Sequence, residues 1–359
     1  MMLLLLLALA TLMPGWAYRG ASAYAYVEEK APAAATGQEK GEKGGEEAAK
    51  EEGKEEGKEE GKPEEKKEEE CPNTFGPIIT DTAVPIDKGK FAIQPFFYLG
   101  FLTSVFNRNW HPVPAGGNFQ SFQMPWRFTY GPIENMEVYV VIPYIHKWAS
   151  DVDKPGPRGQ RSADSGGLGD IDVTLKYRLV EEGPGKPTVT ATFATDFPTG
   201  RFRRLNPRLL GTDALGGGSY IFTTGLDISK CLNPFILYGN LWYSMSTAFM
   251  STALTQFDQR QIDKRKYPRD FVTVNLAGEY VLSENKKWVA LLELTSFWDG
   301  GRLIGRKANV APQALASVLP GIEYIATEKL SFALGVNVDF MGKSFPAYVT
   351  PIFSLIYEF

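Results

Sequence analysis

Histidine and cysteine are scarce in this chain of 359 residues, with only two of each. Nucleophilic catalysis needs a base within reach of a serine or cysteine, and neither His111 nor His146 has a serine at a suitable spacing. The four residues form no cluster with zinc-like spacing, and no pair of carboxylates stands out. We therefore expect no enzymatic activity, no metal and no cofactor.

Long apolar runs are also scarce. Residues 3–13 form one, but a transmembrane helix needs roughly 20 residues. Small residues follow, and cleavage after Ala23 or Ala25 would fit a signal peptide over residues 1–25, although no positive charge precedes the run. A buried core helix is the alternative. No later run is long enough for a membrane helix, so a membrane form of this chain must cross as a β-barrel, which also satisfies every backbone polar group in lipid.

Residues 26–70 are nearly devoid of apolar side chains after position 27. Three consecutive EEGK units occupy residues 51–62. Residues 1–70 carry 17 acidic and 10 basic side chains, against 25 and 28 in residues 71–359. Such a segment cannot bury enough apolar surface to offset its chain entropy, which predicts a disordered periplasmic tether. It is either a spacer or an arm that binds the cell wall or a periplasmic partner, and we expect no nucleic-acid partner.

From residue 90 onward the sequence alternates with the period of two that β-strands show. In residues 170–179, apolar side chains occupy the odd positions and polar or charged ones the even positions. A lysine or arginine near the midplane of the lipid face costs roughly 2–4 kcal/mol, so the charged face should line the interior. Twelve segments show strand patterns: residues 90–101, 118–130, 134–148, 169–181, 187–197, 217–229, 233–246, 269–283, 286–299, 313–326, 328–340 and 346–359.

The predicted connections alternate between short turns and long loops. The turns lie at residues 131–133, 182–185, 229–232, 283–285 and 327. The loops lie at about 102–117, 149–168, 198–216, 247–268 and 300–312, with a shorter one at 341–345. Outer-membrane barrels combine short periplasmic turns, longer extracellular loops and an even number of strands. The sequence thus predicts an all-β fold, a transmembrane antiparallel up-and-down β-barrel of about twelve strands over residues 71–359.

The last strand places apolar side chains at alternate positions up to the final residue. This pattern resembles the signal read by the bacterial barrel-assembly machinery, which we expect as a partner. The residues concerned are Phe353, Leu355, Tyr357 and Phe359.

The interior-facing positions are predicted to be polar and mixed in charge. They either form ion pairs that fill a narrow barrel or line a weakly selective conduit. The candidates for lumen-lining residues are Gln94, Arg127, Glu137, Asp170, Asp172, Lys176, Arg178, Asp196, Asp227, Glu279, Glu293, Asn337 and Asp339.

Several predicted long loops are basic, including residues 201–208 with four arginines. If they face outward, they can neutralise the phosphates of lipopolysaccharide, which together with outer-membrane lipid would be a partner. Attraction of an anionic solute is the alternative.

Two short motifs carry a resemblance to a known family. Residues 167–170 read Gly-Leu-Gly-Asp before a strand, and residues 198–200 read Pro-Thr-Gly after the next one. Both resemble motifs of the outer-membrane proteins linked to meta-pathway phenol degradation, over roughly residues 75–359. The resemblance implies an outer-membrane barrel that passes small hydrophobic or aromatic compounds.

Three functions follow in order of preference. The first is a passive channel or uptake protein for a small-molecule solute. The second is a structural barrel whose charged arm is its working part, and the third, disfavoured by the missing His–Ser pairing, is a barrel enzyme.

The two cysteines are predicted to lie on the same side of the membrane. Cys71 precedes the barrel and Cys231 lies in a predicted short turn, so both would face the oxidising periplasm, where a disulfide is chemically reasonable. Two free thiols too far apart to bond are the alternative. We expect alkylation to add mass to both cysteines of the purified protein only after reduction. Two alkylated thiols in the unreduced sample would rule the disulfide out.

Overall fold

The computed structural model describes residues 74–154, 156, 159–253, 262–282, 285, 287–301 and 307–359. The predicted signal peptide and charged tether lie outside these residues. Within them, no helix combines the length and the hydropathy of a membrane span.

The described residues form sixteen strands and one short 3-10 helix. The long strands are β1 (Phe91–Phe106), β3 (Asn118–Tyr130), β4 (Met136–Ser150), β6 (Ile171–Val180), β7 (Thr188–Phe197), β8 (Ile221–Leu232), β9 (Phe235–Ser246), β12 (Asp270–Val281), β13 (Trp288–Gly301), β14 (Ala314–Thr327), β15 (Leu330–Lys343) and β16 (Phe345–Glu358). The short elements are β2 (Pro112–Val113), β5 (Ala163–Leu168), β10 (Phe249–Ala253), β11 (Ile262–Lys266) and the 3-10 helix η3 (Pro207–Leu209).

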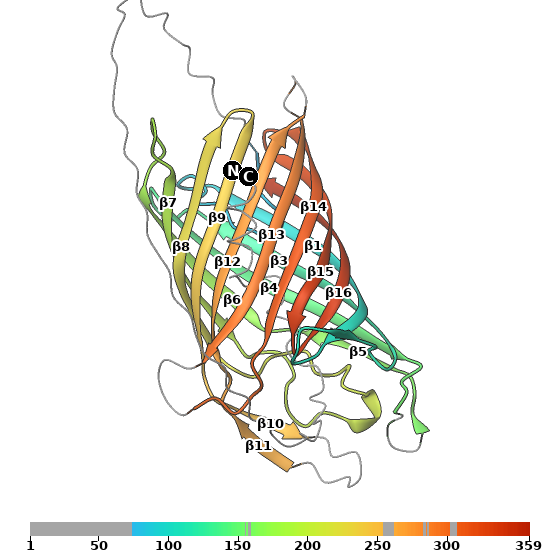
Figure 1. Ribbon diagram of the computed structural model, residues 1–359. Helices are drawn as coiled ribbons and strands as arrows, with labels where there is room; N and C mark the ends of the chain where they lie inside the picture. The colour runs from blue at the N-terminus through green and yellow to red at the C-terminus, as the bar shows by residue number, and fades with distance from the viewer. Residues whose placement is uncertain are drawn as a thin grey trace, which may run out of the picture. The chain divides into compact units, whose positions relative to one another are not determined.

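The twelve long strands form a closed antiparallel barrel, as the sequence predicts. Each pairs with its neighbours along the chain, and β16 returns to pair with β1 from Ala92↔Glu358 to Phe106↔Phe345. Figure 1 shows the tilted strands around the barrel, with β5, β10 and β11 at one end. We call this the long-loop end. The opposite one, where short turns join β3 to β4, β6 to β7, β8 to β9, β12 to β13 and β14 to β15, is the short-turn end.

The last residue of the chain completes the seam between β1 and β16. The backbone N–H of Phe359 donates to the Phe91 carbonyl at 2.8 Å, and the two rings lie 5.7 Å apart. Lys90 Nζ lies 2.7 Å from the Glu358 carboxylate. Hydrogen bonds to Glu358 and Asp87 raise the pKa of Lys90. The end of β16 is therefore tied to the start of β1.

Strands also occur where the sequence predicts only loops. Strand β5 lies within the loop expected at 149–168 and pairs antiparallel with the second half of β4. Strands β10 and β11 pair with each other within the loop expected at 247–268. The turn expected at 229–232 lies instead at Asn233 and Pro234, because β8 continues to Leu232. Proline has no N–H to donate to the ladder, which explains why pairing breaks there.

The two faces of the strands differ as the alternation predicts. In β8, Asp227 is fully buried inside, whereas its neighbours Leu226 and Ile228 are 41% and 43% exposed on the outside. The outer surface carries many exposed large apolar side chains, which suits contact with lipid. They include Leu99, Phe193, Phe222, Leu241, Leu292, Leu334 and Phe340.

The interior is polar on one side and apolar on the other. Val289 and Leu291 from β13 pack with Phe96, Leu319 and Ile352 in one buried cluster. The sequence analysis predicts only polar residues at the lumen, so this apolar side was missed. The inner faces of β13 and β14 combine the apolar residues of this cluster with two buried carboxylates, Glu293 and Glu323.

One glycine admits a large side chain into the polar side. Gly225 of β8 pairs with Trp242 of β9, whose indole N–H donates to Asp227 at 2.8 Å. A Cβ at position 225 would overlap the indole ring and the backbone of β9.

We expect Gly225→Ala to destabilise the barrel by about 1–3 kcal/mol through overpacking. Gly239→Ala on β9 is the control, because a Cβ there meets its nearest neighbour, a Leu276 methyl, at 3.6 Å. Circular dichroism during urea unfolding in detergent measures the stability of both variants. Equal midpoints for the two variants would contradict the packing described here.

Candidate functional site

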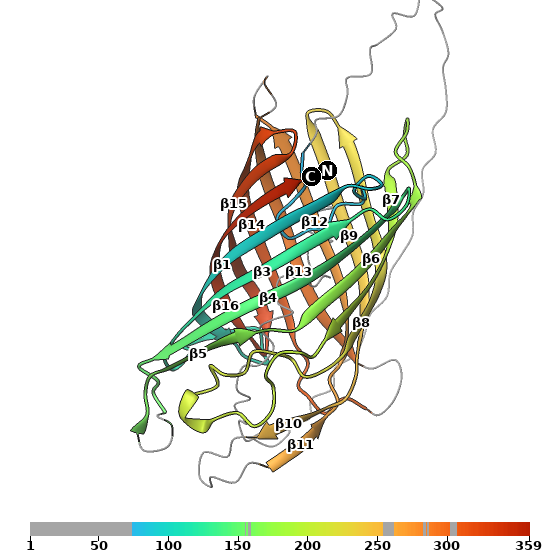
Figure 2. The ribbon, with the colours of Figure 1, turned by 180° about the vertical axis from the view of Figure 1, so that it is seen from behind.

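Residues 74–87, here called the lumen segment, run inside the barrel before β1 begins. Thr74 donates to Glu279 near the short-turn end at 2.7 Å, and the Asp81 N–H reaches Asn240 deeper inside at 3.0 Å. The chain then returns, because the Ile86 N–H donates to Glu137 at 2.9 Å and the Gly89 N–H to the Gly131 carbonyl at 2.7 Å. Figure 2 shows the start of this segment, in blue, among the strands at the short-turn end.

Glu293 of β13 holds the first half of the segment, residues 74–80, here called the inward limb. Its Oε1 accepts the Ile78 N–H at 2.7 Å, its Oε2 accepts the Thr80 N–H at 2.6 Å, and both oxygens lie within 3.2 Å of the Ile79 nitrogen. The carboxylate is completely buried. One side chain thus satisfies three consecutive backbone donors that have no strand partner.

The side chains of this limb fill the apolar side of the lumen. Ile78 and Ile79 are 5% and 8% exposed and belong to the cluster with Val289, Leu291 and Leu319. Burying an isoleucine contributes about 1.5–3 kcal/mol. The limb is therefore held by apolar contact as well as by hydrogen bonds.

Asp81 marks the deepest part of the segment and faces the polar side. Its carboxylate lies 3.3 Å from both Arg127 and Lys176 and accepts the Tyr139 hydroxyl at 3.0 Å. Arg127 also pairs with Glu137 at 3.1 Å and covers the Tyr139 ring, with 3.7 Å from guanidinium carbon to ring centroid. Asp81 of the segment thus pairs with two cationic side chains of the barrel wall.

Asp227 and Asn240 extend this network across β8 and β9. Asp227 accepts Asn240 Nδ2 at 2.9 Å and the Thr192 hydroxyl. Asn240 Nδ2 also donates to the Asp81 carbonyl at 2.8 Å. The wall therefore pairs with backbone as well as side-chain groups of the segment.

The second half of the segment, residues 82–87, here called the outward limb, is bound by the polar side of the wall. The Ala83 N–H donates to Ser229 at 2.8 Å, and the Ala83 carbonyl accepts the Thr190 hydroxyl. Lys176 donates to the Thr82 carbonyl. Both limbs thus have partners along their length.

A separate set of hydrogen bonds fastens a loop at the long-loop end. Asp170 accepts the Gly200 N–H at 2.9 Å and the Gly217 N–H at 2.6 Å, and Thr199 bonds to the backbone of Gly169 and Ile171. Burial raises the pKa of Asp170, and the two N–H groups oppose this rise. The two motifs that carry the family resemblance are therefore in direct contact.

The loop fastened by Asp170 folds into the barrel mouth. Ala214 and Leu215 are buried, and the Ala214 carbonyl accepts Lys147 Nζ from the inner face of β4 at 2.5 Å. Asp213, also buried, accepts the Asn206 N–H at 2.8 Å. Residues 212–215 of the loop are therefore part of the interior, whereas its four arginines at 201, 203, 204 and 208 are exposed.

The structure distributes the predicted lumen residues as follows. Gln94 and Asp170 are half-buried, Arg127 is 18% exposed, and Arg178 binds Asn135 in the turn after β3 at 2.8 Å. The buried ones are Glu137, Asp172, Lys176, Asp196, Asp227, Glu279, Glu293, Asn337 and Asp339. Sequence reasoning missed Glu323, also buried, and the entire lumen segment.

The other predicted site residues lie away from the lumen. Phe353, Tyr357 and Phe359 are exposed on the outer face, with Leu355 half-buried between them. Cys231 is disulfide-bonded, but Cys71 lies outside the described residues, so their pairing stays a prediction.

The two histidines of the described part have different surroundings. The His146 ring lies 4.4 Å from the Trp148 ring at an interplanar angle of 38°, and its Nε2 lies 3.3 Å from the Asp164 carboxylate. His111 is exposed. No group of three or more potential ligands in this part of the chain could hold a metal ion.

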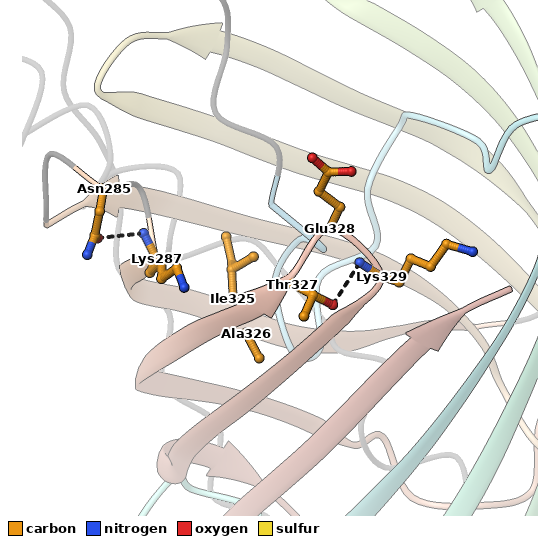
Figure 3. A pocket seen from close by; sticks show the side chains of 7 residues that line it. All are labelled: Asn285, Lys287, Ile325, Ala326, Thr327, Glu328 and Lys329. Atoms are coloured by element: carbon orange, nitrogen blue, oxygen red, sulfur yellow. Dashed lines mark hydrogen bonds between the residues drawn. The ribbon is translucent and has the colours of Figure 1, made fainter.

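A cavity of about 560 Å³ lies on the rim of the short-turn end. Figure 3 shows its side chains, which come from the turn before β13, the end of β14 and the turn after it. The N–H groups of Lys287 and Lys329 donate to Asn285 and Thr327 of the same turns at 3.2 Å. The cavity offers no buried polar group, and we assign it no chemistry.

The barrel is similar to solved membrane barrels. An outer-membrane channel from Pseudomonas putida F1 is 14% identical, with a TM-score of 0.60 over 77% of this chain and 98% of that chain. The β domain of the Bordetella autotransporter BrkA is 9% identical, with a TM-score of 0.45 over 76% and 100%. The translocator domain of the autotransporter NalP from Neisseria meningitidis is 12% identical, with a TM-score of 0.43 over 76% and 90%.

Comparison by sequence gives no match. No family model matches the chain, and no curated protein does. The similarity to the Pseudomonas channel therefore bears on the fold alone.

We expect Glu293→Ala to loosen the lumen segment, because an unpaired buried N–H costs about 1–3 kcal/mol. Hydrogen exchange at the amides of residues 78–80 should accelerate at least about tenfold, the equivalent of about 1.4 kcal/mol. The exchange rate in Glu293→Gln should lie between those of the unchanged chain and Glu293→Ala, because the remaining carbonyl oxygen of the glutamine still accepts a hydrogen bond. Glu328→Ala, which removes an exposed carboxylate at the same end, is the control. Unchanged exchange in Glu293→Ala would show that the carboxylate does not hold the segment.

Proposed function

We propose that this chain is an outer-membrane channel for the uptake of small molecules and that the lumen segment closes it. The observation that carries the proposal is a closed barrel whose lumen is occupied by a segment, residues 74–87, that hydrogen bonds, ion pairs and apolar contacts hold in place. A wall built only for rigidity would gain from a packed core without such a removable chain. The fold shared with the Pseudomonas channel supports the same function.

The proposed solute is small and apolar or aromatic. The resemblance to proteins linked to phenol degradation implies such compounds, and the apolar side of the lumen suits them. Val289, Leu291 and Leu319 give a solute an apolar surface once Ile78 and Ile79 move away.

The proposed orientation places the short-turn end in the periplasm, as is usual for outer-membrane barrels. The predicted tether would then enter from the periplasm and lead directly into the lumen segment. Lipopolysaccharide at the long-loop end and the assembly machinery at Phe359 complete the proposed partners.

We expect the purified full chain in planar bilayers to conduct rarely, and Glu293→Ala to conduct more often because its lumen segment leaves more readily. Glu328→Ala should behave like the unchanged chain. Deletion of residues 28–70 should leave the conductance unchanged. The absence of conductance and of solute flux in all variants would favour the alternative of a structural barrel with a working tether.

A further inference from the structure

Three buried carboxylates occupy neighbouring strands near the short-turn end. Glu279 lies on β12, Glu293 on β13 and Glu323 on β14, and each is at most 1% exposed. All three accept hydrogen bonds from the inward limb of the lumen segment, including the Phe75 N–H to Glu323 at 3.3 Å. They therefore face the same part of the lumen.

Two of these carboxylates have an oxygen left over. Glu279 Oε2 accepts Thr74 and Tyr238, and Glu323 Oε1 accepts Phe75 and Ser331. Within the described chain, Glu279 Oε1 and Glu323 Oε2 are buried without a hydrogen-bond partner. A buried, unpaired acceptor is costly, and here two of them flank residues 74 and 75.

Positive charge is absent from this side of the described lumen. No ion pair involving Glu279, Glu293 or Glu323 forms among the described residues. On the opposite side, by contrast, Arg127 and Lys176 form ion pairs with Asp81, Glu137 and Asp227. A cation entering here would meet carboxylates that no basic side chain already satisfies.

An apolar surface adjoins the carboxylates. Glu279 is paired in register with Leu291, and Glu323 with Val289, and both apolar residues contact the cluster that contains Ile78. The bound segment thus combines apolar side chains with N–H donors. The same combination describes an apolar molecule with an amino or amidino group.

We propose that Glu279 and Glu323 bind the cationic nitrogen group of a small aromatic amine or amidine, whose apolar part takes the place of Ile78 and Ile79. This inference rests on the proposed function and specifies its solute class. Binding of the solute and seating of the inward limb exclude each other, so the solute itself favours the open lumen.

The test compares two aromatic ions that cross lipid poorly, benzamidinium and benzenesulfonate. Their flux is measured into liposomes that contain the full chain. We expect benzamidinium flux to exceed benzenesulfonate flux by about tenfold, a difference of about 1.4 kcal/mol. Glu279→Gln combined with Glu323→Gln should abolish most of this preference, whereas Glu328→Gln should retain it.

A second measurement follows the lumen segment directly. Benzamidine should accelerate hydrogen exchange at residues 78–80, whereas its neutral isostere benzamide should do so far less. If the double variant lacks the heat-modifiable gel mobility of a folded barrel, Glu279→Gln alone is used.

The outcomes separate the two proposals. Flux of neither ion through any folded variant would overturn the channel function. Equal flux of both ions, or a preference for benzenesulfonate, would overturn the cation site and leave the channel intact. So would a preference that the folded double variant retains in full, or that Glu279→Gln leaves undiminished where it replaces the double variant.

Discussion

A chain segment inside a barrel has no ladder of its own, so each of its backbone N–H groups needs a partner from the wall. In this protein the Glu293 carboxylate supplies that partner for three consecutive residues. A buried carboxylate is itself tolerated only when it accepts hydrogen bonds. Segment and wall therefore depend on each other, and neither is satisfied alone.

The division of the lumen into two sides follows from this dependence. The inward limb places Ile78 and Ile79 against apolar residues of β13 to β16, while Asp81 reaches Arg127 and Lys176. An entirely apolar lumen would leave the segment's backbone unpaired, and an entirely polar one would leave its isoleucines without contacts. A two-sided lumen accommodates a loop that presents both kinds of group.

The barrel could be predicted from the sequence because strand alternation and loop length are local patterns. Lys176 of β6 and Asp227 of β8, which the alternation places inside, are buried there. The lumen segment could not be predicted in the same way. Its sequence has no period of two, contains Pro77 and Pro85, and binds residues more than 200 positions away. The one available signal was the apolar character of the inner face around Glu293, which requires a covering partner.

Different contacts hold the chain inside the two ends of the barrel. At the long-loop end, Asp170 binds backbone N–H groups of a loop between two strands, so this loop is anchored covalently on both sides. At the short-turn end, the segment is followed by β1 and preceded by the N-terminal part of the chain. A competing ligand in the lumen can act on the inward limb first, because the outward limb continues into the wall. Withdrawal would uncover Glu279, Glu293 and Glu323 together, so the same movement that opens the lumen would also make its entrance acidic.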